Sequence, residues 1–157
     1  MFRQKLTPQQ AFQKMLQYCG YQERSHFEAR EKLYGFGLNK SDVEELLSRL
    51  IEEDYLNEER YAILFVGGKF RMKKWGRIKI IHELKQKRVG SNNIKKAIKE
   101  IDEDIYNKTL YQLALAKWKS LKAEQYLNRL AKTTNFLLQK GYEQELISVS
   151  IKQIREK

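Results

Sequence analysis

Cysteine, proline and glycine are scarce in this chain, and each scarcity excludes something. Cys19 is the only cysteine, so the chain can form neither an internal disulfide nor a multi-cysteine zinc site, and we expect Cys19 to be buried or half-buried. One proline and eight glycines leave few helix breakers, and β-branched residues do not alternate with polar ones over any convincing stretch. The expected fold class is therefore all-α.

Long apolar runs are also missing. No run approaches the roughly 20 apolar residues of a membrane span, and the segment from Met1 to Tyr18 lacks the apolar core of a signal peptide. We therefore expect no membrane partner and a cytoplasmic location.

Catalytic constellations are absent as well. His26 and His82 are the only histidines, and no second histidine follows His82-Glu83 at the spacing of a zinc-binding helix. The glycines at 67, 68 and 76 do not form a phosphate loop, and the paired carboxylates belong to polar helix faces. We predict that the chain is not an enzyme, with no catalytic residue, no metal site and no cofactor.

Positive charge, in contrast, is present and confined to one stretch. The basic segment, residues 69–99, holds twelve basic side chains and one acid, Glu83, and so carries the whole net charge of +11. The acidic belt, residues 42–59, directly precedes it with eight acids and one arginine. A neutral protein with one basic segment has a surface suited to a polyanion.

Helix start and stop signals recur along the chain. Thr7-Pro8-Gln9-Gln10 predicts a capping box, and Ser25 with Glu28 and Ser41 with Glu44 repeat it. Asn57 and Ser91 are further candidate caps, and Gly37 and Gly141 are expected to end helices in the left-handed conformation. Apolar stripes at helical spacing follow the starts, as in Val43, Leu46, Leu47, Leu50 and Ile51.

The chain also aligns with itself. An offset of 51 superposes apolar positions such as Phe27 on Ile78, Leu33 on Leu84 and Val43 on Ile94, and a further 53 carries Leu84 to Leu137. We predict three tandem three-helix (helix-turn-helix-like) repeats, 7–54, 57–103 and 105–156, in an elongated curved array. Short links are expected at Tyr55-Leu56 and around Asp104.

Two positions in the second repeat are ambiguous. Arg88 occupies the place of Gly37 and Gly141, so either its turn has a different shape or a charge there is worth the strain. We favour a different shape, because Gly90 can re-form the turn. Gly67-Gly68 lies inside an expected helix, where it indicates close helix packing or, alternatively, a bend that re-aims the basic end.

Aromatic residues are interleaved with the basic ones from Lys69 to Lys79, and at least one of Phe65, Phe70 and Trp75 should lie near the surface. This pattern favours binding to phosphates or to an acidic protein groove over an ordinary solvated helix end. Major-groove reading by Asn92 and Asn93 is disfavoured, because asparagine near a helix start usually caps it. The expected contact residues are Lys69, Arg71, Lys73, Lys74, Arg77, Lys79, Lys85, Lys87, Arg88, Lys95 and Lys96.

Three blocks of the sequence resemble one known family, the RecX regulatory proteins. The first block begins Glu23-Arg24-Ser25 and ends Tyr61-Ala62. The second is Gly76-Arg77-Ile78 followed by Glu83-Leu84 and Lys87, and the third is Phe136-Leu137 followed by Lys140-Gly141-Tyr142. The chain departs from the family at Arg88, where glycine is usual, and in stopping after Lys157.

The resemblance implies three helical repeats and a regulator that binds RecA recombinase filaments on single-stranded DNA. Such proteins lie along the filament groove and inhibit ATP hydrolysis and strand exchange, which places them in DNA recombination and repair. Expected partners are therefore the RecA filament and single-stranded DNA, with the chain a monomer. One alternative is a general DNA-binding helical protein that acts without RecA, and another is an adaptor for an acidic protein.

Overall fold

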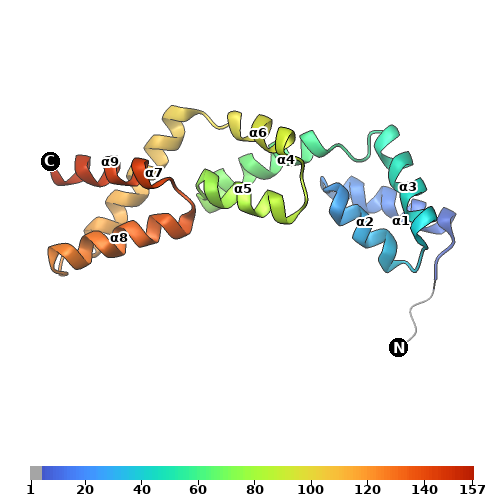
Figure 1. Cartoon of the computed structure of the whole chain (residues 1–157), viewed down its shortest axis with the longest axis horizontal. Helices are drawn as coiled ribbons and strands as arrows, with labels where there is room; N and C mark the ends of the chain where they lie inside the picture. Colours follow the sequence, from blue (N-terminus) through green and yellow to red (C-terminus); the bar gives the residue numbers. More distant parts are fainter. Residues whose placement is uncertain (1–4) are drawn as a thin grey trace. The chain divides into compact units, whose positions relative to one another are not determined.

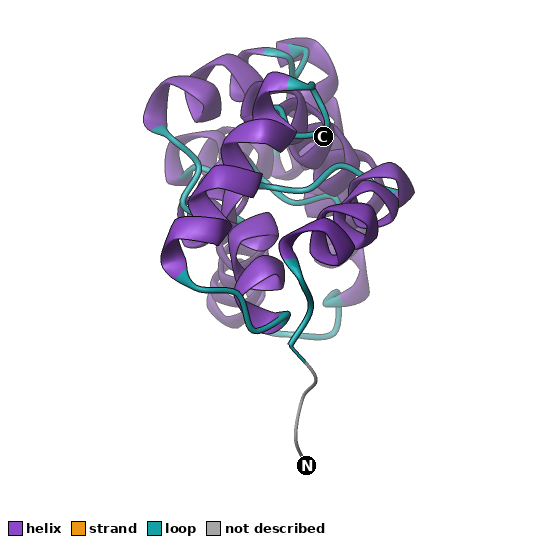
Figure 2. Ribbon diagram, turned by 90° about the vertical axis from the view of Figure 1, so that its right-hand side faces the viewer, coloured by secondary structure: helices purple, strands orange, loops and turns teal. Residues whose placement is uncertain are grey.

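The computed structural model describes residues 5–157, and every regular element among them is a helix (Figures 1 and 2). The all-α fold class is confirmed. The elements are α1 (Pro8–Tyr21), α2 (His26–Gly35), α3 (Lys40–Glu52), α4 (Glu58–Gly68), the π-helix η1 (Lys69–Lys73), α5 (Arg77–Gln86), α6 (Ser91–Lys99), α7 (Glu103–Ser120), α8 (Tyr126–Lys140) and α9 (Gln144–Arg155).

The helices belong to two compact units. Unit 1 contains Met1–Phe65 and Leu84–Ala97, and unit 2 contains Val66–Glu83 and Ile98–Lys157. Helices α4, α5 and α6, which form the second predicted repeat, thus contribute residues to both units. The repeat boundaries 7–54, 57–103 and 105–156 remain a prediction.

In unit 1, helices α1, α2 and α3 pack on one another (Figure 1). Their apolar stripes supply a core that includes Phe12, Met15, Leu33, Val43 and Leu50. Cys19 joins this core as a free, buried thiol, as expected. Amphipathic stripes at helical spacing therefore account for the packing of this unit.

Most predicted helix starts are confirmed. Thr7 and Ser25 form the expected capping boxes, and Asn57 Oδ1 accepts a hydrogen bond of 2.9 Å from the Arg60 N–H. Two were wrong. Asn39 caps α3 two residues before Ser41, because its side chain already accepts the Asp42 N–H. Ser91 lies inside the first turn of α6, where the preceding Gly90 carbonyl accepts the Ile94 N–H.

The turns after the second helices are alike, and Arg88 is the informative case. Gly37 and Gly141 have φ values of 85° and 100°, as predicted, and Arg88 has a φ of 58°. The prediction of a different turn at Arg88 was wrong. The Arg88 and Val89 N–H groups bond to the Lys85 and Leu84 carbonyls, which repeats the pattern at Gly141. The Arg88 guanidinium lies 4.8 Å from the Phe27 ring centroid, a contact that offsets the strain.

In unit 2, helices α7, α8 and α9 pack on one another around Tyr106. The Tyr106 ring centroid lies 5.7 Å from that of Phe70 and 5.2 Å from that of Tyr142. Two expectations fail here. Ile78, aligned with Phe27 as a core position, is 53% exposed, and Asp104, expected in a link, lies in the first turn of α7 after the Asp102 cap.

Candidate nucleic-acid interface

The helical path changes at Gly67-Gly68, where α4 ends and the π-helix η1 begins. A Cβ at Gly68 would meet no atom within 4 Å, and one at Gly67 would meet only the Arg71 side chain. Close helix packing, the first interpretation of this pair, was therefore wrong. After η1, Lys74 adopts the left-handed conformation with a φ of 60°. π-Helical turns occur frequently at functional sites.

The end of α8 holds the chain that follows η1 in a fixed position. The Gly76 N–H donates to the Lys140 carbonyl at 2.8 Å, and the Ile78 N–H donates to the Gly141 carbonyl at 2.9 Å. The Tyr142 hydroxyl donates to the Lys74 carbonyl at 2.8 Å. A Cβ on Gly76 would lie 2.4 Å from the Gly141 carbonyl carbon, so only glycine fits at this crossing. The start of α5 is thus anchored to α8.

Three cations of η1 and of its C-cap residue point into solvent. Arg71, Lys73 and Lys74 are exposed, and within residues 5–157 no carboxylate lies within salt-bridge distance of any of them. Lys140 adds a fourth positive charge, because its Nζ lies 3.3 Å from the Lys73 carbonyl oxygen. Sequence reasoning missed Lys140, although the offset of 53 aligns it with Lys87. We call Arg71, Lys73, Lys74 and Lys140 the basic cluster.

Arg77 has a different role from the one predicted for it. Its side chain is only 22% exposed, and its guanidinium lies 2.9 Å from Glu103, 3.4 Å from Glu143 and 3.9 Å from the Tyr106 ring centroid. Its backbone N–H donates to the Tyr106 hydroxyl, which donates to Glu143. Burial and the Glu143 hydrogen bond raise the pKa of Tyr106, so its hydroxyl stays protonated as a donor. Arg77 therefore ties α5 to α7 and α9.

Five of the predicted contacts, Lys85, Lys87, Arg88, Lys95 and Lys96, lie in unit 1, where several have partners. Lys87 Nζ lies 4.0 Å from Glu28, Lys96 Nζ lies 3.7 Å from Glu59, and Arg88 contacts Phe27. Lys85 and Lys95 are exposed. One of the two asparagines disfavoured for base reading has another use, since the Asn93 side-chain amide donates to Glu58 at 3.0 Å. The basic segment is thus divided between the units, and acids of unit 1 neutralise part of it.

Trp75 is the aromatic residue that the interleaving places beside these cations. It is half-buried, with Lys79 Nζ 4.6 Å and Lys69 Nζ 5.1 Å from its ring centroid, whereas Phe70 is buried. An aromatic side chain between lysines suits nucleic acid, whose phosphates and bases alternate along the strand.

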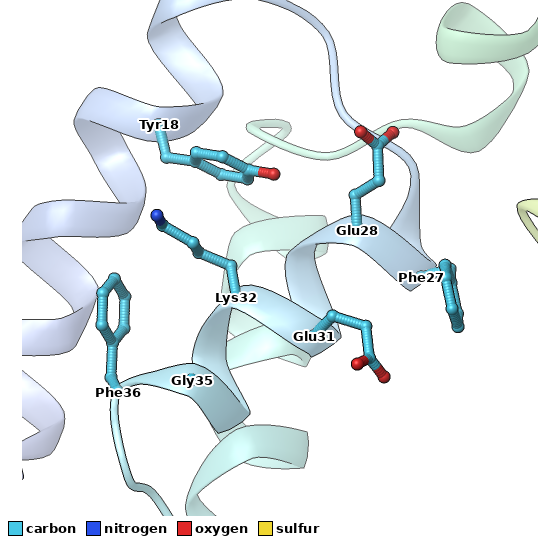
Figure 3. Close-up of a pocket in the computed structure, with 7 residues that line it drawn as sticks. All are labelled: Tyr18, Phe27, Glu28, Glu31, Lys32, Gly35 and Phe36. Carbon is cyan, nitrogen blue, oxygen red and sulfur yellow. The ribbon is translucent and has the colours of Figure 1, made fainter. Parts of the chain in front are cut away.

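Features of other kinds of site are few in the described part of the chain. No group of three His, Cys, Asp or Glu side chains there could hold a metal ion, and no helix there is long and apolar enough to cross a membrane. An open groove of about 550 Å³ lies on unit 1 (Figure 3). Its lining residues are Tyr18, Phe27, Glu28, Glu31, Lys32, Gly35 and Phe36. Lys32 extends toward the Tyr18 ring, and its Nζ lies 5.3 Å from the ring centroid.

Together these features define an all-α repeat protein with a localised, anchored basic surface. Two family models match the chain, "RecX, second three-helix domain" over residues 57–98 and "RecX, third three-helix domain" over residues 104–149. The chain belongs to the RecX family.

Named relatives resemble the chain in sequence, and solved structures resemble it in fold. Proteins named "Regulatory protein RecX" from Bacillus cytotoxicus and Bacillus thuringiensis are 24% identical over 148 residues, which is 94% of this chain and 55% of each relative. This chain thus spans about half the length of those relatives. The crystal structure of RecX from Lactobacillus salivarius superposes with a TM-score of 0.87 at 22% identity, over 96% of this chain and 97% of that one. A second RecX crystal structure gives 0.84 at 22% identity, over 92% and 71%.

Proposed function

We propose that this chain is a non-enzymatic regulator that binds RecA filaments on single-stranded DNA and inhibits their ATP hydrolysis and strand exchange. The observation that carries the proposal is the set of exposed cations Arg71, Lys73 and Lys74 on the π-helix η1 and its C-cap, next to the anchored start of α5. Membership of the RecX family supports the regulatory role, since the relatives are named regulatory proteins. We further propose that it acts in the cytoplasm as a monomer.

Anchoring matters because binding costs conformational entropy. The backbone at Lys74, Gly76 and Ile78 is already held by hydrogen bonds to Tyr142 and to the end of α8, so a ligand that contacts Lys74 need not order this part of the chain. Solvent-exposed cations without acidic partners also keep their full charge for a ligand. A polyanion that binds here exchanges its counterions for fixed lysine and arginine side chains.

The proposal is tested by reversing charge where the fold does not depend on it. The double variant Lys73→Glu/Lys74→Glu should inhibit RecA ATP hydrolysis on single-stranded DNA at least about tenfold less potently, because it removes two phosphate contacts and adds two repulsive charges. Arg77 is left intact, because its ion pairs hold unit 2 together. The matched control is Lys108→Glu/Lys122→Glu, at two exposed lysines of unit 2 outside the basic segment.

Three results distinguish the candidate functions. Wild-type potency in a folded Lys73→Glu/Lys74→Glu variant would exclude the basic cluster as the contact. Affinity for bare DNA equal to that for filaments, without an effect on hydrolysis, would support a general DNA-binding protein. Little DNA affinity at any salt concentration would support an adaptor for an acidic protein.

A further inference from the structure

The two tryptophans of this chain occupy contrasting environments. Trp118 is 8% exposed in the core of unit 2, where the Tyr126 ring packs against its edge. Trp75 lies instead in the connection between η1 and α5 and is half-buried. Because Trp75 is only half-buried, part of its aromatic surface is available to a ligand. Complete burial would stabilise the fold more.

A second aromatic side chain in unit 2 shares this environment. Phe136 on α8 is half-buried, with Lys117 Nζ 5.0 Å and Lys140 Nζ 5.9 Å from its ring centroid. Lys140 follows Phe136 by one helical turn, and its Nζ lies 3.3 Å from the Lys73 carbonyl oxygen. Gly76, which directly follows Trp75, donates a hydrogen bond to the Lys140 carbonyl. Trp75 therefore lies near the C-terminal end of α8, the end that carries Phe136 and Lys140.

Trp75 and Phe136, each beside two lysines, therefore flank the basic cluster on one continuous part of unit 2. We propose that these two aromatic side chains stack on bases of single-stranded DNA while the neighbouring lysines contact its phosphates. This inference rests on the proposed function, and it names the residues that distinguish a single strand from other polyanions.

The chemistry favours a single strand over a duplex or an acidic protein. Bases of a duplex are already stacked on one another and expose only their edges, so a surface tryptophan cannot stack on them without unpairing. An acidic protein groove would need the lysines but not the aromatic faces. Base stacking on an aromatic side chain is independent of sequence, which suits a strand of any composition.

Fluorescence provides the first test, because the second tryptophan is buried. Binding of oligothymidylate should quench the emission of the wild-type protein, and inorganic polyphosphate, which has charge but no bases, should not quench it. In Trp75→Phe only Trp118 remains, and the quenching should disappear while binding persists. Equal quenching by polyphosphate, or undiminished quenching in Trp75→Phe, would contradict the proposal.

Affinity provides the second test. Trp75→Leu and Phe136→Leu should each bind oligothymidylate about tenfold more weakly, with affinity for polyphosphate and for duplex DNA unchanged. Trp75→Phe should retain most of the wild-type affinity, because it keeps a stacking surface. The matched control is Tyr126→Leu, which removes an aromatic that is 46% exposed and lies 4.9 Å from the Arg155 guanidinium, outside the basic cluster.

The outcomes separate this inference from the proposed function. Wild-type affinity for oligothymidylate in folded Trp75→Leu and Phe136→Leu variants would overturn the stacking role, and RecA inhibition by the same variants would leave the regulatory function standing. Stacking without any effect on RecA hydrolysis would support the inference and overturn the function.

Discussion

At the scale of single residues, Arg88 adopts the left-handed conformation that glycine adopts at positions 37 and 141. Its guanidinium contacts the ring of Phe27, which lies far away in the sequence. Arg77 is similar, because its carboxylate partners Glu103 and Glu143 come from α7 and the start of α9. Helix caps, in contrast, were predicted well, since a cap and its N–H donors are three residues apart.

The variant Arg88→Gly should be more stable to unfolding than the variant Arg88→Ala. Arg88→Gly and Arg88→Ala both lose the contact with Phe27, but only alanine keeps the steric cost of a Cβ at positive φ. Urea denaturation should therefore give Arg88→Gly a free energy of unfolding about 1 kcal/mol above that of Arg88→Ala. Equal values for the two variants would mean that the turn relaxes when the arginine is removed.

Cys19 should be almost inert in the folded protein. Burial raises the pKa of its thiol to about 11, so at pH 8 its thiolate fraction is about a hundredfold below that of an ordinary cysteine. Alkylation by iodoacetamide at pH 8 should be slower by about that factor in the native protein than in urea. Because the folded-state pKa is the higher one, the stability contributed by the neutral thiol is complete below pH 8 and is lost as the pH rises toward 11. Equal alkylation rates in the two states would contradict this burial.

At the scale of elements, the connection between η1 and α5 was the least predictable part of the chain. Gly67-Gly68 indicated an irregularity inside a helix, but not the π-helix that follows or its end. That end lies where Tyr142 and the end of α8 hold the backbone at Lys74 and Gly76. These partners lie more than 60 residues away in the sequence and carry no local signal. The expected helix order and most starts were right because apolar periodicity and caps are local features.

Gly68 and Gly76, eight residues apart, should respond to substitution by alanine in opposite directions. Gly76→Ala places a Cβ 2.4 Å from the Gly141 backbone and should destabilise unit 2 by about 2 kcal/mol or more. Gly68→Ala adds a methyl group in open space at helical φ and ψ, and should stabilise by up to about 1 kcal/mol. Thermal unfolding measures both. A neutral Gly76→Ala variant would show that the α5–α8 crossing is looser than described.

At the scale of the whole molecule, the sequence located the charge but not its distribution over the fold. Unit 2 contains 17 basic and nine acidic side chains, and so carries eight of the eleven net positive charges. The acidic belt beside the basic segment was visible in the sequence, but the pairing of Glu28 with Lys87 and of Glu59 with Lys96 required the folded chain. The candidate site is therefore narrower than the basic segment, and it includes Lys140 from outside that segment.

Neutralising Lys73 and Lys74 should change how binding depends on salt. Each phosphate contact to a single strand contributes about 0.7 to the slope of log affinity against log salt concentration, so Lys73→Gln/Lys74→Gln should reduce that slope by about 1.4. Lys108→Gln/Lys122→Gln should leave it unchanged. The measurement is oligothymidylate binding by anisotropy over a range of NaCl concentrations, and identical slopes for the two double variants would count against the basic cluster.

The most direct test of the central claim is RecA ATP hydrolysis on single-stranded DNA, measured with this protein at substoichiometric amounts relative to RecA. Regulation of a filament, as opposed to competition for free DNA, predicts that hydrolysis falls even when most RecA subunits have no bound partner. Unchanged hydrolysis at every ratio up to equimolar would contradict the account.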